Sequence, residues 1–275
     1  MTLDEAITHL RSQPEHWQLI HDAYLGEDVF EAAVRFEASE EFSEVMRLSE
    51  GRVNGGTVLD LGAGTGIASY AFARNEAALV YALEPDPSKM VGRGAIERLK
   101  DVARITVLEA AAESIPLEDE SVDVVYARQV LHHIRDLGKA IDECYRVLRR
   151  GGMFIASREH VLRSEEERRV FLEEHPLHKL VGNENAYYLG EYVSAIRQSR
   201  LRLRRVFGPW GSVINTFPGA VSEDDLSRLA RDFLARRFGR LGYRAARFAW
   251  VRQAALRVFG DDTPPGRLYT FVAVK

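Results

Sequence analysis

A turn with three glycines at alternate positions is the part of this sequence whose residue types most directly suggest chemistry. Residues 58–61 (Val-Leu-Asp-Leu) form a short apolar run that predicts a strand, and Gly62, Gly64 and Gly66 follow it directly. Glycine lets the backbone turn tightly and approach a ligand without a Cβ in the way, and a helix that begins there presents free N–H groups. This order of strand, glycine turn and helix predicts a small-molecule site.

The spacing of the glycines separates the nucleotide-binding possibilities. The dinucleotide fingerprint G-x-G-x-x-G requires a glycine at the place of Ile67. The phosphate loop ends in Gly-Lys followed by Ser or Thr, and the turn contains no lysine. The sequence therefore disfavours hydride transfer and excludes an NTPase loop at this turn.

One carboxylate, Glu84, stands at the end of the next expected strand, about twenty residues after the turn, where dinucleotide-binding folds place a ribose-binding acid. A carboxylate there can accept hydrogen bonds from both ribose hydroxyls of a nucleoside. The alternative is a solvated loop residue, and the preceding glycine turn favours the ribose interpretation.

Polar side chains also follow the fourth and fifth expected strands, and the carboxyl ends of strands are where an open α/β sheet places its ligands. Arg128 and His133 follow the fourth strand, and Glu159 and His160 follow the fifth. A histidine can act as a general base because its ordinary pKa lies near neutrality, although it can equally orient the loop. Glu159 and His160 could deprotonate or orient a hydroxyl, or form a salt-bridged loop. His133, Glu159 and His160 are the candidate catalytic residues.

Short β-branched runs alternate with helical stretches from residue 57 to about residue 205, which is typical of a parallel sheet covered by helices. The helix expected at 137–149 carries an apolar stripe and should stop at Gly151 and Gly152. The expected strands are 57–61, 78–83, 104–108, 122–127, 153–157, 201–207 and 268–274.

The chain divides into three expected parts. Residues 1–50 form a helical N-terminal cap, residues 51–207 with 267–275 form the core, and residues 208–266 form a helical, arginine-rich insertion before the last strand. The insertion carries nine arginines against one acid, Asp232, between Leu226 and Gly260. These are Arg228, Arg231, Arg236, Arg237, Arg240, Arg244, Arg247, Arg252 and Arg257.

Composition excludes several classes of protein. Its 275 residues, with 46% hydrophobic and 28% charged residues and a net charge of −4, are ordinary for a globular chain with a buried core. The sequence contains no long apolar stretch and no secretory leader, so we expect a cytoplasmic protein without a membrane span. The single cysteine, Cys144, excludes an intrachain disulfide and a cysteine-built metal cluster. Pro176 separates His175 from His178, and no metal site is expected there.

These motifs resemble those of the class I S-adenosylmethionine-dependent methyltransferases, in particular the small-molecule branch that includes the ubiquinone/menaquinone-type enzymes. Residues 60–66 resemble the family's first motif, D/E-x-G-x-G-x-G, and the resemblance covers residues 55–160. It implies an α/β, Rossmann-like fold with a seven-stranded, mostly parallel sheet and helices on both faces. It also implies S-adenosylmethionine as cofactor and S-adenosylhomocysteine as product.

The resemblance also assigns roles to individual residues. Gly62 and Gly64 would lie against the methionine part of the cofactor, Asp60 would help to hold its ammonium group, and Glu84 would bind the ribose. Where the family often has an aspartate for adenine the chain has Ala111, so adenine would be bound by backbone groups. The expected cofactor-binding residues are Asp60, Gly62, Ala63, Gly64, Gly66, Glu84, Pro85, Ala112, Glu113 and Arg128.

Three functions remain open. The leading hypothesis is methylation of a small molecule, possibly anionic, with an oxygen nucleophile favoured. Alternatively, the arginine-rich insertion binds phosphates and the enzyme methylates RNA, although the net charge of −4 speaks against nucleic acid. The third hypothesis is a non-catalytic module that binds S-adenosylmethionine. A homo-oligomer is compatible with each.

Overall fold

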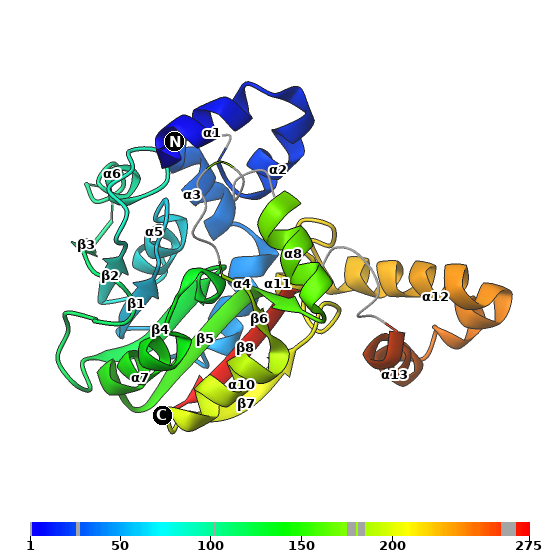
Figure 1. The fold of residues 1–275 in the computed structure, drawn as a ribbon. Coiled ribbons are helices and arrows are strands. Elements are labelled where there is room, and N and C mark those ends of the chain that lie inside the picture. The colour runs from blue at the N-terminus through cyan, green and yellow to red at the C-terminus, as the bar shows by residue number, and fades with distance from the viewer. Residues whose placement is uncertain (1, 26–27, 102, 175–179, 181–184, 260–267) are drawn as a thin grey trace.

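The computed structural model describes residues 2–25, 28–101, 103–174, 180, 185–259 and 268–275. A central sheet is covered by helices on both faces, further helices lie across one end of it, and a helical pair projects sideways (Figure 1). No helix in the described ranges combines the length and apolar character that a bilayer crossing requires. His175 and His178 lie outside the described residues.

The sheet has the strand order β3-β2-β1-β4-β5-β8-β7, and the two-residue strand β6 pairs with β5. Neighbours from β3 to β5 are parallel, whereas β8 runs antiparallel to both β5 and β7. This confirms the predicted fold class. The strands are β1 Thr57–Leu61, β2 Leu79–Leu83, β3 Ile105–Leu108, β4 Val122–Arg128, β5 Leu148–Leu162, β6 Tyr187–Tyr188, β7 Arg202–Phe207 and β8 Leu268–Val274.

Successive residues of the strands point to opposite faces of the sheet, and each face has its own core. Val58 and Tyr126 belong to a core shared with the N-terminal helices and the helix after β1. Leu59 and Val125 belong to a core shared with α7 (Leu137–Val147) and α10 (Leu189–Gln198). Both faces of β1 and β4 are therefore buried, which explains why these strands read as continuous apolar runs.

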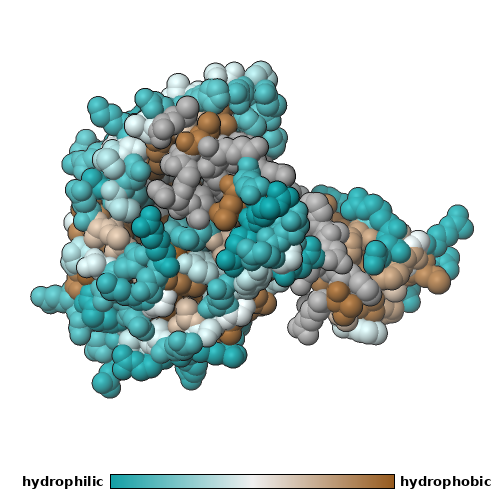
Figure 2. Space-filling model, viewed as in Figure 1, coloured by the Kyte–Doolittle hydropathy of each residue, from teal (hydrophilic) through white to brown (hydrophobic). Residues whose placement is uncertain are grey.

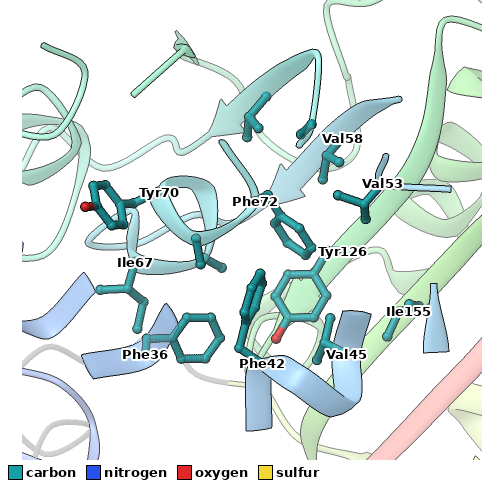
Figure 3. Close-up of a cluster of buried hydrophobic side chains, with 14 of the residues drawn as sticks. Phe36, Phe42, Val45, Val53, Val58, Ile67, Tyr70, Phe72, Tyr126 and Ile155 are labelled. Atoms are coloured by element: carbon teal, nitrogen blue, oxygen red, sulfur yellow. The ribbon is translucent and has the colours of Figure 1, made fainter. Parts of the chain in front are cut away.

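The N-terminal segment is helical, with α1 Leu3–Arg11, η1 Pro14–His16, α2 Trp17–Asp22, α3 Val29–Glu37 and α4 Glu40–Leu48. Ser39 caps α4, since its side chain accepts the N–H of Phe42 at 3.1 Å. The rings of Phe42, Phe72 and Tyr126 follow one another with centroids 5.3 and 5.2 Å apart (Figure 3). Aromatic packing thus joins α4 to the sheet.

The helix before β5 ends earlier than the glycines predict. Asp136 caps α7 by accepting the N–H of Lys139 at 2.9 Å, but Leu148 already has extended backbone angles and begins β5. The expected end at residue 149, with Gly151 and Gly152 as the cap, was wrong, because α7 ends at Val147. Leu148 is fully buried in the core on this face, and its place in the sheet beside Val122 decides its conformation.

The remaining helices complete the layers and the sideways projection. Within α12, Gly239 has φ 62° and ψ −149°, which interrupts the helix with a kink. These helices are α5 Ile67–Arg74, α6 Arg93–Ile96, η2 Leu131–His133, α8 Glu165–Glu174, α11 Val213–Thr216, α12 Glu223–Ala245 and α13 Ala249–Phe259.

Candidate functional site

The glycine turn joins β1 to α5 at the carboxyl edge of the sheet. Gly62, Gly64 and Gly66 have φ angles of 64°, 54° and 81°, a left-handed region that side chains disfavour. A Cβ on Gly62 would lie 1.9 Å from Cγ2 of Val130, so this glycine lets the loop after β4 approach the turn. A Cβ on Gly64 would meet only the carbonyl oxygen of Val91, at 3.9 Å, so Gly64 faces open space.

Glu84 follows β2 and is tied to the glycine turn. The N–H of Gly64 donates to its Oε2 at 2.8 Å, and the N–H of Asp86 donates to its Oε1 at 2.9 Å. Burial raises the pKa of this carboxyl, which is only 8% exposed. Each carboxylate oxygen has room for a further donor, so both oxygens can accept from a ribose diol.

Asp60 lies in β1, directly before the turn, and is also buried. The hydroxyl of Ser69 in α5 donates to its Oδ2 at 2.6 Å. Burial raises the pKa of Asp60 to about 6, so the carboxylate is still mostly ionised at neutral pH. A buried carboxylate with one neutral partner is suited to a cation such as an ammonium group.

The other residues expected to bind the cofactor lie at the ends of neighbouring parallel strands. Ala63 is held between the strands, since its N–H donates to the carbonyl oxygen of Leu83 at 3.0 Å. Pro85 is exposed after β2, and Ala112 is buried in the loop after β3. Glu113 is half-buried, with its carboxylate 3.4 Å from the N–H of Asp136.

Glu159, in β5, is fully buried and its carboxylate organises the loop that follows β4. Its Oε1 accepts the N–H groups of Val130 and Leu131 at 3.0 and 3.1 Å. Its Oε2 accepts the N–H of His132 at 3.3 Å and lies 2.9 Å from Nδ1 of the same residue. Both oxygens thus have protein partners at the start of η2.

The two candidate histidines lie on different elements, His133 in η2 and His160 in β5. His133 is exposed, and its ring centroid lies 4.1 Å from that of the buried His132. His160 is half-buried and stacks on Phe171 of α8, with ring centroids 4.0 Å apart and planes 11° from parallel. Phe171 also lies 6.2 Å from His132, ring centroid to ring centroid, so His160 is linked through Phe171 to the loop that Glu159 binds.

Arg128 belongs to a buried cluster that sequence reasoning missed. Its guanidinium binds the fully buried Glu41 of α4 with two hydrogen bonds, Nε to Oε1 at 2.7 Å and Nη2 to Oε2 at 3.1 Å. Arg158 donates from Nη1 to the carbonyl oxygens of Ile214 and Phe217, both at 2.6 Å, and its Nε lies 4.0 Å from Glu41. Glu41 lies in an acid-rich helix that reads as a solvated face, so nothing in its spacing signals this pairing.

The first helix covers the loop that follows Glu84. The carboxylate of Asp4 accepts hydrogen bonds from the backbone N–H groups of Lys89 and Met90, both at 3.2 Å, and from the hydroxyl of Ser88. A cavity of about 290 Å³ lies beside the glycine turn under these helices. Its lining includes Arg11, Tyr24, Thr65, Lys89 and Met90.

Among the residues that the structure describes, no group of three or more His, Cys, Asp or Glu side chains is placed to hold a metal ion. Cys144 lies on the buried face of α7, and burial raises the pKa of its thiol. The site as described therefore rests on hydrogen-bonding and ionic groups of the protein.

Part of this chain is similar in sequence to known proteins. Residues 59–156 match the family model described as a methyltransferase domain. An uncharacterized methyltransferase of Mycobacteroides abscessus is 36% identical over 105 residues, which are 38% of this chain and 40% of the relative. The ubiquinone/menaquinone biosynthesis C-methyltransferase UbiE of Haemophilus ducreyi is 36% identical over 104 residues, 37% of this chain and 40% of that relative. The chain thus matches about two fifths of the length of these curated relatives.

The crystal structure of the YcgJ protein of Bacillus subtilis has the same fold, with a TM-score of 0.54 at 19% identity over 86% of this chain and 97% of that one. The matched segment begins within β1 and ends in β5, so it contains the glycine turn, Glu84 and the loop after β4. Residues 59–156 therefore match the methyltransferase domain model, and the chain shares its fold with the YcgJ protein.

Proposed function

We propose that the whole chain transfers the methyl group of S-adenosylmethionine to a small-molecule acceptor, and that the acceptor atom is an oxygen. The observation that carries this proposal is the position of Glu84. Its carboxylate is held by the N–H groups of Gly64 and Asp86 and keeps acceptor capacity on both oxygens, at the edge of a space that Gly64 leaves open.

The residues present fit S-adenosylmethionine. Glu84 would accept the two ribose hydroxyls, Asp60 would lie near the ammonium group, and the backbone of Ala112 and Glu113 would border the adenine. When bound, this cofactor supplies a methyl group on a sulfonium, which is a good leaving group. The protein then contributes chiefly by aligning the acceptor and excluding water.

The loop after β4 supports a division of labour between the polar candidates. Because both oxygens of Glu159 hold backbone N–H groups and His132, Glu159 acts as a positioning residue in this proposal. His133 is exposed on the short helix η2, and it is the candidate base for an acceptor hydroxyl. His160, stacked on Phe171, would border the acceptor.

A small acceptor agrees with the cover over the site. Asp4 fastens α1 to the loop at residues 88–90, and the cavity beneath the N-terminal helices measures only about 290 Å³. Its three basic lining residues, Arg11, Lys89 and Arg98, outnumber the one acid, Asp28, which pairs with Arg98. This excess of positive charge supports an acceptor with an anionic group. The proposed protein has a cap (1–50), a core (51–207 with 267–275) and an insertion (208–266). Its cytoplasmic location and a homo-oligomeric state stay predictions.

The test is turnover with methyl-labelled S-adenosylmethionine and three sets of acceptors that present phenolic or carboxylic oxygens, amines, and acidic carbons. The proposal expects S-adenosylhomocysteine to accumulate with an oxygen acceptor and to fall at least about tenfold in His133→Ala, since general base catalysis contributes about 10² to 10⁴ in rate. His16, half-buried in η1, supplies the control, His16→Ala. Label transfer to RNA alone, or cofactor binding without turnover of any acceptor, would contradict the proposal.

A further inference from the structure

The pair of helices α12 and α13, here called the α12–α13 hairpin (residues 223–259), projects from the body of the protein (Figure 1). It presents large apolar side chains to the outside, beside polar ones (Figure 2). Leu241, Trp250 and Val258 are 78%, 71% and 70% exposed. Further exposed apolar residues on the hairpin are Phe238, Tyr243 and Phe248.

These side chains are not the hairpin's own core. Phe233, Leu234 and Ala246 form that core, with Ala255 and Leu256 packed against it. After the kink at Gly239 the helix folds back closely, since a Cβ on Gly242 would lie 2.2 Å from the carbonyl oxygen of Leu234. Phe238 and Leu241, next to the kink, are not part of this core, and their side chains are exposed.

The hairpin also stands off from the sheet. A cavity of about 590 Å³ separates it from the end of β7 and the start of β8. Leu226, Ala230 and Leu256 line the cavity from the hairpin, and Phe207 and Tyr269 line it from the sheet. The cavity thus lies on the inner side of the hairpin. The tip of the hairpin, meaning the residues around Gly239, does not line this cavity.

Charge on the hairpin is opposite to charge on the rest of the chain. Between Leu226 and Phe259 there are nine arginines and one acid, Asp232. The remaining residues have 28 basic and 40 acidic side chains, a net charge of −12. Arg236, Arg240 and Arg244 are exposed beside the apolar residues of the tip. An anionic surface would therefore attract the hairpin and repel the body.

We propose that the tip of the α12–α13 hairpin binds the interface of a membrane that contains anionic lipids. In this arrangement the arginines contact headgroup phosphates, while Leu241 and Trp250 enter the boundary between headgroups and acyl chains. Helices that lie at such interfaces combine Lys or Arg with Trp, Phe and Leu in this way. This inference goes beyond the proposed methyl transfer and does not depend on it.

Two other occupants fit less well. RNA would use the arginines and aromatic rings, but it offers no apolar environment for Leu241 and Val258, which are the most exposed aliphatic side chains of the hairpin. A second copy in a two-fold dimer would place the same surface on both sides, so arginines would face arginines. A lipid surface accommodates both the charges and the aliphatic groups.

The test uses the full chain and the position of its three tryptophans, Trp17, Trp210 and Trp250. In the double variant Trp17→Phe/Trp210→Phe, Trp250 is the only tryptophan. We expect this protein to float with vesicles of phosphatidylcholine and phosphatidylglycerol in equal parts, at about 0.15 M salt, and not with phosphatidylcholine alone. The emission of Trp250 should shift to shorter wavelength and be quenched by brominated acyl chains.

Charge reversal on the tip should remove the binding. Arg240→Glu/Arg244→Glu should weaken partitioning at least about thirtyfold, which corresponds to about 1 kcal/mol for each basic residue removed from an anionic surface. The matched control is Arg202→Glu/Arg204→Glu on β7, where both arginines are exposed and far along the chain from the hairpin. A second control, Trp210→Phe/Trp250→Phe, keeps only Trp17, which is 62% exposed on α2 and should show no shift.

Several results would overturn the proposal: no flotation with either vesicle, equal flotation of the tip and β7 variants, or an emission maximum of Trp250 that does not move. Binding of a single-stranded RNA without vesicle binding would replace it with a nucleic-acid surface. A dimer that shifts Trp250 without vesicles would replace it with self-association. Flotation is measured without cofactor, so failure here leaves the methyltransferase proposal untouched.

Discussion

Arginine side chains have different roles in two regions of the molecule, one buried and one exposed. At the carboxyl edge of the sheet, Arg128 and Arg158 are buried, and their guanidinium groups bind Glu41 and two backbone carbonyls. On the α12–α13 hairpin, the arginines around Gly239 are exposed, and between Leu226 and Phe259 arginines outnumber acids nine to one. Buried arginines therefore stabilise contacts between distant parts of the chain, whereas exposed arginines give the hairpin a positively charged surface.

Removing the charge of Glu41 should break the buried side of this comparison and have the largest effect. Glu41→Gln leaves two guanidinium groups buried without a counter-charge, so we expect a loss of about 3–5 kcal/mol in the free energy of unfolding. Glu40→Gln is the matched control, because Glu40 is the exposed neighbour on the same helical turn. Urea denaturation that finds equal stabilities for the two variants would show that the cluster does not stabilise the fold.

The buried carboxylate of Glu159 provides a second test of how much a buried charged group stabilises the fold. In Glu159→Gln the side chain keeps one acceptor oxygen for the three N–H groups of residues 130–132, and its amide faces donors. We expect a loss of about 1.5–3 kcal/mol, the range for hydrogen bonds to charged groups. Glu173→Gln on the exposed surface of α8 is the control. If thermal unfolding shows Glu159→Gln to be as stable as the wild type, the positioning role is wrong.

The pKa of Asp60 links the buried region to cofactor binding. Burial raises this pKa to about 6, so the cofactor-free fold gains stability when Asp60 is protonated, and that gain is lost as pH rises through 6. The ionised form is the one that attracts an ammonium group. Affinity for S-adenosylmethionine should therefore fall by up to about tenfold as pH drops from 7 to 5, because most of the Asp60 carboxyl is protonated at pH 5.

Asp60→Asn should bind the cofactor weakly at both pH values and remove most of this pH dependence. Calorimetric titrations at the two pH values measure it directly. A wild-type affinity that does not change between them, or a variant that keeps the full pH dependence, would separate Asp60 from the ammonium group.

The smallest effect is expected on the hairpin. Arg240→Gln/Arg244→Gln removes two exposed charges that fix nothing inside the protein, so the free energy of unfolding should change by no more than about 0.5 kcal/mol. A loss comparable to that of Glu41→Gln would mean that the hairpin arginines also hold the fold together, and the contrast between the two regions would disappear.

Most of the fold was predictable because its signals are local. β1 and β8 have the bounds that their β-branched runs predict. β5 was expected at 153–157 but extends over Leu148–Leu162, so Glu159 and His160 lie within the strand and not after it. The helix before β5 was extended too far because the capping signal of Gly151 lies beyond the point where Leu148 enters the sheet. The two-residue strand β6 was not predicted, since Tyr187 and Tyr188 pair with β5 through a contact that only the folded chain creates.

The candidate site was predictable where backbone geometry decides and less so where long-range pairing decides. The left-handed angles of Gly62, Gly64 and Gly66 follow from a pattern that the sequence displays openly. The partner of Arg128 could not be read from the sequence, because Glu41 lies 87 residues away in an acid-rich helix. The same holds for Asp4 and the loop at Ser88, which meet only after the N-terminal helices pack.

The central claim is that Glu84 and the glycine turn hold S-adenosylmethionine, and calorimetric titration of Glu84→Gln with this compound tests it most directly. Exposed Glu118 supplies the control, Glu118→Gln. The account predicts wild-type affinity for the control and binding at least about tenfold weaker for Glu84→Gln, the loss of a charged hydrogen bond, with folding verified by circular dichroism. Equal affinities in a folded Glu84→Gln protein would contradict it.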